Sequence, residues 1–174
     1  MAQSSSTLTR LSEAFVISCG TITLDIVERK VLLIRWKKNG EIFLPKGRKN
    51  IGESLEDAAV RETYEETSFR VTILPLQTPT LATPGTPAGQ ADKLNTEPIA
   101  FSQRLTDNNR LKLIFWFPAK GDSTVAPEPG TQEEGEDFDP IWVELDSVIE
   151  TLTFADDRRI AERFISLTSS YFAE

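Results

Sequence analysis

The sequence predicts an α/β fold, with β-strands before and after a helix in the middle of the chain and a second helix at the C-terminus. Segments such as Lys30–Trp36 and Leu111–Ala119 are rich in β-branched and apolar residues, a composition typical of strands. Ser54–Ser68 begins with a Ser-x-x-Asp pattern, which marks the N-terminus of a helix. Asp156–Phe172 has apolar residues at helical spacing and so predicts the second helix. Those apolar residues are Ile160, Phe164 and Leu167.

The length predicts one domain. A chain of 174 residues can bury a sizeable core but is too short for two ordinary domains. Residues 1–10 are polar and rich in Ser and Thr, so we expect a flexible tail there and a single domain over residues 11–174. The only cysteine, Cys19, lies in an alternating apolar run and is expected to be a small buried side chain. The chain has no histidine, so acid–base chemistry would fall to carboxylates, lysine or tyrosine.

The first third of the chain predicts three strands. Phe15–Leu24 and Lys30–Trp36 have strand composition and flank the polar turn Asp25–Arg29, so we expect them to pair. Ile42–Leu44 predicts a short third strand, and a glycine-bearing loop then reaches Gly52.

After the helix, Phe69–Leu76 again has strand composition. Gln77–Pro98 is rich in Pro, Thr and Gly and is too long for a simple turn, which predicts a mobile lid or an inserted loop. Ala100–Leu105 and Leu111–Ala119 predict a hairpin. Within its second strand, Leu113–Phe117 is continuously apolar and therefore expected to be central in the sheet.

The last third predicts a long loop followed by a strand and helices. Lys120–Pro140 contains Pro, Gly and Glu and is expected to be a polar loop. Ile141–Leu145 predicts a final short strand, and Asp146–Leu152 is compatible with a short helix before the C-terminal one.

A dense cluster of charged residues lies on the central helix. At a period of about 3.6 residues per turn, Glu62, Glu65 and Glu66 project within an arc of roughly 100°. Carboxylates so close repel one another unless a cation lies between them, and a hard divalent cation such as Mg²⁺ does this well. Arg61 can also pair with Glu65 one turn along the helix. The alternative is an ordinary solvated face with weak ion pairs, but the capped helix and the glycine-bearing loop before it favour a site.

These residues complete the pattern G-x5-E-x7-R-E-x-x-E-E, which resembles the signature of the Nudix hydrolase superfamily. The match covers Gly47 to Phe69. Thr63 stands where that signature usually has an aliphatic residue, and Ser68 stands where it usually has glycine. Neither departure removes a carboxylate. The residues that carry the match are Gly47, Glu53, Arg61, Glu62, Glu65 and Glu66.

The resemblance implies an α/β/α sandwich with a mixed central sheet, and an enzyme that hydrolyses a nucleoside diphosphate derivative or a related pyrophosphate with Mg²⁺ or Mn²⁺. It implies that Glu62 and Glu66 bind the metal, with the backbone carbonyl of Lys46 as a third candidate ligand. Glu65 is implied to be the base or a further ligand. The residues implied to hold the loop against the helix are Glu53 and Arg61.

Family members often add an acidic ligand from a distant loop. The candidate here is Glu136, in an acidic run six residues before Trp142. The alternative is that this acidic run only keeps a loop soluble. The other acidic residues of this run are Glu133, Glu134 and Asp137.

Charge is distributed unevenly along the chain. The net charge is −8, yet the segment from Arg29 to Lys49 holds eight basic residues and one acidic residue, a local charge of 8 − 1 = +7. Such a patch beside a carboxylate cluster suits a polyanionic small molecule, whereas the acidic protein as a whole is a poor candidate for nonspecific nucleic-acid binding. For the lysines, ordinary surface positions on turns are the alternative. The candidate substrate-binding residues are Arg35, Lys37, Lys46, Gly47, Arg48 and Lys49.

The loop Leu44–Arg48 resembles that of Nudix enzymes acting on diphosphoinositol polyphosphates and dinucleoside polyphosphates. Hydrolysis of ADP-ribose, NADH or capped RNA stays open, as does a catalytically silent module that senses a nucleotide or inositol pyrophosphate. Trp36 could stack on a base or belong to the core. The segment Thr96–Pro98, with Phe101 and Trp116, resembles fungal family members.

No stretch approaches the length of about 18 apolar residues that a membrane-spanning helix needs. We therefore expect no membrane association and a cytoplasmic location, although a secreted mature form stays open because a removed signal peptide leaves no trace. The sequence does not predict an oligomeric state.

Overall fold

The computed structural model describes residues 8–83, 94–132 and 135–172, which form eight strands and three α-helices. The strands are β1 (Phe15–Asp25), β2 (Lys30–Trp36), β3 (Ile42–Phe43), β4 (Lys46–Arg48), β5 (Thr72–Ile73), β6 (Ala100–Leu105), β7 (Leu111–Lys120) and β8 (Phe138–Glu144). The helices are α1 (Leu55–Thr67), α2 (Val148–Thr151) and α3 (Ala155–Thr168).

All eight strands belong to one mixed sheet. Its main path is β3-β2-β1-β7-β5, with β4 paired to β1, β6 to β7 and β8 to β2. The two long strands β1 and β7 run parallel, and the other pairs are antiparallel. The predicted mixed sheet is therefore confirmed, and so is the central place of β7, which pairs with β1, β5 and β6.

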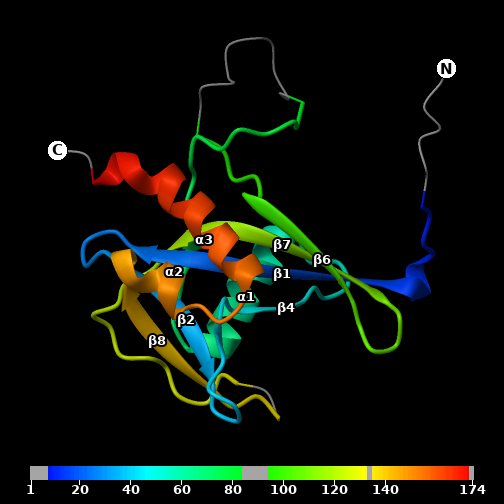
Figure 1. Cartoon of the computed structure of the whole chain (residues 1–174), viewed down its shortest axis with the longest axis horizontal. Helices are drawn as coiled ribbons and strands as arrows, with labels where there is room; N and C mark the ends of the chain where they lie inside the picture. The colour runs from blue at the N-terminus through cyan, green and yellow to red at the C-terminus, as the bar shows by residue number, and fades with distance from the viewer. Residues whose placement is uncertain (1–7, 84–93, 133–134, 173–174) are drawn as a thin grey trace.

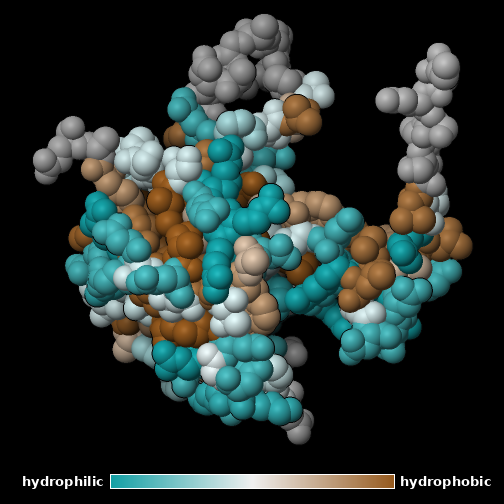
Figure 2. Space-filling model, viewed as in Figure 1, coloured by the Kyte–Doolittle hydropathy of each residue, from teal (hydrophilic) through white to brown (hydrophobic). Residues whose placement is uncertain are grey.

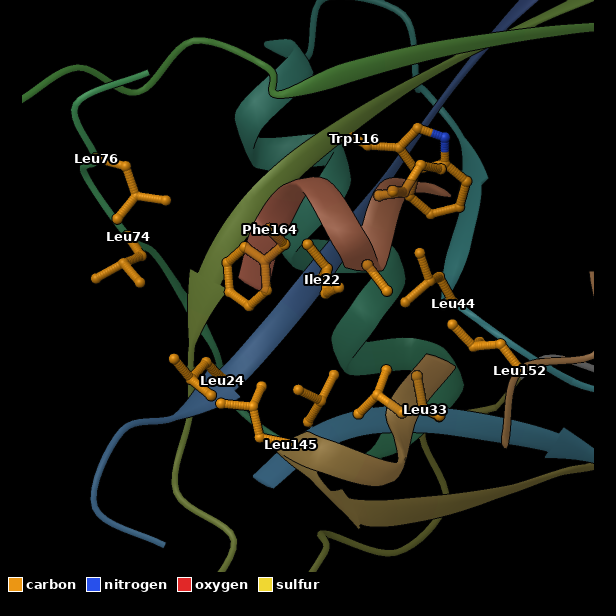
Figure 3. Close-up of a cluster of buried hydrophobic side chains, with 14 of the residues drawn as sticks. Ile22, Leu24, Leu33, Leu44, Leu74, Leu76, Trp116, Leu145, Leu152 and Phe164 are labelled. Atoms are coloured by element: carbon orange, nitrogen blue, oxygen red, sulfur yellow. The ribbon is translucent and has the colours of Figure 1, made fainter. Parts of the chain in front are cut away.

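Helices cover both faces of the β1–β7 centre, α1 behind it and α3 in front of it in the view of Figure 1. Alternation along β1 sends side chains to opposite faces. Cys19 packs with Ala58 and Ala59 of α1, whereas Ile22 belongs to the larger cluster that contains Phe164 of α3. Figure 3 shows the ring of Phe164 next to Ile22 in that cluster. The sandwich of a sheet between two helices agrees with the predicted fold class, and Cys19 is fully buried as expected.

Two boundaries near the helices differ from the prediction. The segment after Pro45 was expected to be loop, but Lys46–Arg48 forms β4 against β1, with Gly47 opposite Cys19. The strand β8 begins at Phe138, three residues earlier than expected, because it pairs with β2 from Trp36 to Lys30. Pro140 is tolerated there because β8 has a neighbour on one side only among the described strands.

The ends of the two long helices also have identifiable causes. At the end of α1, Ser68 adopts the left-handed conformation (φ 64°), and its N–H donates to the carbonyl of Tyr64 at 2.7 Å. The predicted C-terminal helix to Phe172 is shorter: α3 ends at Thr168, and a 3₁₀ turn follows over Ser169–Tyr171.

The long segment Gln77–Pro98 lies partly outside the described residues, as do residues 1–7 of the expected tail. Leu76, just before this segment, and Asn95, near its end, exchange backbone hydrogen bonds of 3.0 and 2.8 Å. The described strand β5 is only two residues long, shorter than the predicted Phe69–Leu76. In the described part of the chain, no helix has the length and apolar character needed to cross a membrane.

Candidate active site

The carboxylate cluster of α1 lines a cavity of about 490 Å³ between α1, β4, β7 and the segment before β8. We call it the carboxylate cavity. Both glutamates and basic side chains line this cavity, so it presents negative and positive charges together. Its charged lining residues are Glu62, Glu65, Glu66, Glu136, Arg61, Lys46, Arg48 and Lys112, and Gly47 and Asn50 complete it.

The local sequence of α1 explains why these carboxylates share a face. Ser54 caps the helix, since its Oγ accepts the N–H of Asp57 at 3.0 Å. Ala58 and Ala59 pack on β1 and fix the rotation of the helix. Thr63, which replaces the usual aliphatic residue, is fully buried and hydrogen-bonds Thr21 on β1 at 2.7 Å. The departure at this position therefore adds a polar contact within the packed face.

Glu66 is the most buried of these carboxylates, with 3% of its surface exposed. Its Oε2 accepts the backbone N–H of Lys46 at 2.7 Å, which ties α1 to β4. The pKa of Glu66 is raised to about 8, chiefly by burial. The nearby charges of Glu136 and Glu62 contribute to this rise, whereas Lys46 opposes it. A carboxylate in this setting would be stabilised by a cation.

Glu62 lies directly against Gly47. A Cβ placed on Gly47 would be 1.6 Å from Glu62 Oε2, so only glycine allows this approach without movement. Burial raises the pKa of Glu62, while its hydrogen bond from Arg61 at 2.8 Å opposes that shift. The close approach brings the β4 backbone and the Glu62 carboxylate to the same wall of the cavity.

Arg61 joins the helix to the loop that precedes it. Its guanidinium donates to both oxygens of Glu53 at 2.7 and 3.0 Å, to the Arg48 carbonyl at 2.9 Å, and to Glu62 and Glu65 at 2.8 and 2.7 Å. Glu53 in turn accepts the N–H of Asn50 at 2.8 Å. These hydrogen bonds fasten the loop between β4 and α1 to the helix.

Replacing Arg61 by lysine should destabilise the protein, because an ammonium group cannot reproduce the planar fork that binds several acceptors. With the Arg61 side chain 25% exposed, we expect Arg61→Lys to lower the free energy of unfolding by about 1–3 kcal/mol, measured by urea denaturation. Arg70→Lys is the matched control: Arg70 also binds both oxygens of one glutamate, but it is 74% exposed and its replacement should have no measurable effect. Equal effects of the two substitutions would contradict the supporting role.

Glu136 reaches the cavity because the loop before β8 is fastened to α1. The side-chain amide of Gln132 donates to the carbonyls of Glu66 and Phe138 at 3.2 and 2.7 Å, and its oxygen accepts the N–H of Phe138 at 3.0 Å. Thr131 also donates to the Glu65 carbonyl at 2.8 Å. Sequence reasoning missed these contacts, since an isolated Gln in a polar loop carries no distinctive signal. The candidates Glu133 and Glu134 lie outside the described residues.

Lys112 on β7 is a cavity residue that the motif did not indicate. The pKa of its ammonium group is lowered to about 8, chiefly by burial and also by the nearby charges of Lys46, Arg104 and Arg48. Together with Lys46 and Arg48, Lys112 places several positive charges on the cavity lining, which suits an anionic ligand. The sequence signal was weak, because Lys112 precedes an apolar run and looks like an ordinary strand end.

Three predicted substrate-binding residues do not line the carboxylate cavity. Lys37 pairs with Asp137 and Asp139 at 2.7 and 3.5 Å. Arg35 is exposed on β2, where its Cα partners are Ile42 and Asp139. The ammonium of Lys49 donates to the carbonyl of Asn50 at 2.9 Å. The structure thus separates these three from Lys46, Gly47 and Arg48, which do line the cavity.

The donor set fits a hard divalent cation. Every acidic group in the cavity offers carboxylate oxygens, the ligands that Mg²⁺ and Mn²⁺ prefer. Among the main electrostatic partners of buried Glu66, Lys46 is the one cation. In the described residues, no three acidic, Cys or His side chains converge closely enough to form a ready cation cage. One reason is that Arg61 Nη1 holds Glu62 and Glu65 at 2.8 and 2.7 Å, so binding a cation would require these contacts to rearrange.

Comparison with known proteins identifies the family. The NUDIX domain model matches residues 18–164. Among similar solved structures are a C. elegans Ap4A hydrolase in a binary complex (16% identity, TM-score 0.60, covering 89% of this chain and 98% of that one) and a MutT protein from Bacillus halodurans (21%, 0.55, 85% and 80%). A NUDIX hydrolase from Nitrosomonas europaea is similar as well (16%, 0.58, 87% and 89%). The fold, the carboxylate helix and the family match agree, and the chain belongs to the Nudix family.

Proposed function

We propose that this chain is a metal-dependent pyrophosphohydrolase that cleaves a phosphoanhydride bond in a highly phosphorylated small molecule, a diphosphoinositol polyphosphate or a dinucleoside polyphosphate. The observation that carries the proposal is the carboxylate cavity, where four glutamates lie beside Lys46, Arg48 and Lys112. Carboxylates suit a divalent cation and the basic side chains suit phosphates, so the cavity can hold both. The likeness to a protein named as an Ap4A hydrolase is consistent with a dinucleoside polyphosphate.

Glu62, Glu66 and the Lys46 carbonyl would hold the metal, with Glu65 as the base or a further ligand and Glu136 as an additional ligand. A bound Mg²⁺ or Mn²⁺ would supply charge stabilisation and lower the pKa of a water. The side chains of the protein would bind the substrate's phosphates and orient them relative to the metal. Lys112 would neutralise phosphate charge from the β7 side of the cavity. Arg61 and Glu53 would hold β4 and the loop between β4 and α1 in place.

The test is a substrate panel assayed with Mg²⁺, with Mn²⁺ and with EDTA, using ADP-ribose, diadenosine tetraphosphate and diphosphoinositol pentakisphosphate. We expect turnover only with metal, and a stronger inhibition by added salt for the two polyphosphates than for ADP-ribose. ADP-ribose as the best substrate at physiological salt would contradict the polyphosphate assignment, and ligand binding without any turnover would identify a silent sensor.

Lys112→Gln and Lys120→Gln form a matched pair on the same strand. Lys112 lines the carboxylate cavity, whereas Lys120 is exposed at the far end of β7. Removing the Lys112 charge should lower kcat/KM for polyphosphates on the order of tenfold, and Lys120→Gln should leave it unchanged.

A further inference from the structure

Two outer strands of the sheet, β8 and β6, differ in how well they are protected against pairing with another chain. Among the described strands each has one neighbour, β2 for β8 and β7 for β6. β8 contains Pro140, which has no N–H to donate, and two acidic residues, Asp139 and Glu144. Proline and charged side chains on an outer strand hinder the addition of a further strand. Over its six residues β6 has no proline and one charged residue, Arg104.

One side of β6 carries exposed apolar side chains. Phe101 and Leu105 are 52% and 56% exposed, and alternation along the strand places them on the same side. The ring of Phe101 lies against Phe115 of β7, with centroids 5.4 Å apart, and Phe115 packs on the cluster that contains Ala58 of α1. Figure 2 shows apolar side chains gathered at this end of the sheet, where the β6–β7 hairpin lies next to the start of β1. The apolar face under α1 therefore continues to the outer strand.

The other side of β6 brings two opposite charges close to the same edge. Ser102 lies on this side, because Trp116 Nε1 donates to Ser102 Oγ at 3.0 Å and Trp116 belongs to the cluster packed under α3. Asp156, at the start of α3, lines two adjoining surface cavities of about 330 and 310 Å³ together with Ser102. Arg104 is on the same side as Ser102, two residues further along. No ion pair joins Arg104 or Asp156 to another residue in the described part of the chain.

Two copies of β6 complement each other when they pair antiparallel about a two-fold axis at Gln103. In this register Phe101 of each copy lies opposite Leu105 of the other, so two apolar cross-strand pairs form on one side. Gln103 faces Gln103 of the second copy, and two amide groups can exchange hydrogen bonds. On the other side Arg104 lies opposite Ser102 of the second copy, beside which Asp156 lines the surface. Opposite charges thus meet twice, and Arg104 does not face its own copy.

We infer that the chain forms a homodimer in which the β6 strands of two copies pair antiparallel, centred on Gln103, and join the two sheets into one. A second copy is the partner that this edge fits, because each copy supplies one half of every apolar pair and one charge of every ion pair. Two-fold symmetry closes the contact at two copies, and Pro140 protects the other long outer strand. This inference goes beyond the proposed function and does not depend on it.

The first test is the molar mass of the full chain, measured by sedimentation velocity from about 1 to about 100 µM. We expect a monomer–dimer equilibrium. Leu105→Glu should raise the dissociation constant of the dimer at least about tenfold, because it places a charge opposite Phe101. Val27→Glu is the matched control, since Val27 is 86% exposed in the turn between β1 and β2 and its replacement should change nothing. A chain that stays monomeric over this range would overturn the inference.

A charge exchange distinguishes the β6 contact from a dimer formed through another surface. Arg104→Asp and Asp156→Arg should each weaken the dimer about tenfold, because like charges then meet across the contact. The double variant restores opposite charges and should return the dissociation constant to within about threefold of wild type. A dimer that neither single substitution weakens would show that the copies meet elsewhere.

A disulfide tests the register itself. Two copies of Gln103→Cys should become cross-linked on mild oxidation, because directly opposite Cβ atoms lie about 5 Å apart. Leu105→Cys should not be cross-linked, since the two copies of this position are offset by four residues along the strand, about 13 Å. The native Cys19 is buried and does not contribute. Equal cross-linking of the two variants, or none in Gln103→Cys, would contradict pairing centred on Gln103.

Discussion

Glu66→Gln is expected to reduce turnover by about two to four orders of magnitude while the fold is retained, since loss of a metal-binding charge removes several kcal/mol of transition-state stabilisation. The amide oxygen of glutamine can still accept the N–H of Lys46, so the contact between α1 and β4 survives. The measurement is kcat with saturating Mg²⁺, with circular dichroism to check the fold. Glu56→Gln is the matched control, because it makes the same chemical change on the same helix outside the carboxylate cavity. Undiminished turnover in the Glu66 variant would reject its role.

The same substitution should change the pH dependence of stability in the metal-free protein, because wild-type Glu66 titrates and glutamine does not. Burial raises the pKa of Glu66 from 4.5 to about 8. At pH values between these two pKa values, Glu66 is more protonated in the folded state than in the unfolded state. The contribution of Glu66 to stability therefore decreases as pH rises from 4.5 through about 8. Glutamine has no such dependence. In EDTA, the Glu66→Gln variant should therefore gain stability relative to wild type between pH 5 and pH 8, as measured by urea unfolding at pH values spanning the two pKa values.

Local patterns in the sequence predicted α1 and its carboxylate face because everything they need is local. The cap of Ser54 and the 3.6-residue spacing of the glutamates place the side chains without reference to the rest of the chain. The residues around Gly47 were harder to predict. β4 is only three residues long and exists through its pairing with β1, a contact between distant parts of the chain that no local propensity encodes.

The basic residues of the carboxylate cavity were also only partly predictable from local sequence. The +7 segment suggested Lys46, Arg48 and Lys37 as substrate-binding residues. Lys46 and Arg48 line the carboxylate cavity, whereas Lys37 pairs with the acidic segment before β8. Lys112 enters the cavity because β7 runs parallel to β1, an arrangement that connects residues nearly a hundred positions apart. Counting charges along the sequence does not identify Lys112 as a neighbour of Lys46 and Arg48. The cavity of about 310 Å³ between β2, β3, β6 and the start of α3 likewise combines segments far apart in the sequence. For Trp36, which lines it, the sequence therefore left open whether the ring contacts a ligand or belongs to the core.

Gly47→Ala should reduce turnover by about a hundredfold, because the new methyl group would occupy the space of the Glu62 carboxylate. Its position would be 1.6 Å from Glu62 Oε2 and 2.1 Å from Cδ. The β4 backbone is held by pairing with β1, so the Glu62 side chain must move, and its hydrogen bond from Arg61 at 2.8 Å would be lost. The measurement is kcat with saturating Mg²⁺.

Two comparisons isolate this steric cause. Gly52 lies in the loop that follows β4, and the Cβ of Gly52→Ala would meet nothing within 4 Å. Its positive φ of 79° makes the alanine cost about 1 kcal/mol of stability, with turnover kept. Glu62→Gln and the double variant Gly47→Ala/Glu62→Gln should lose turnover to the same extent, because the methyl group acts only through a carboxylate that is already neutralised. A further loss in the double variant would show that Gly47 is needed for more than the position of Glu62, and wild-type turnover in Gly47→Ala would show that the carboxylate can move aside without consequence.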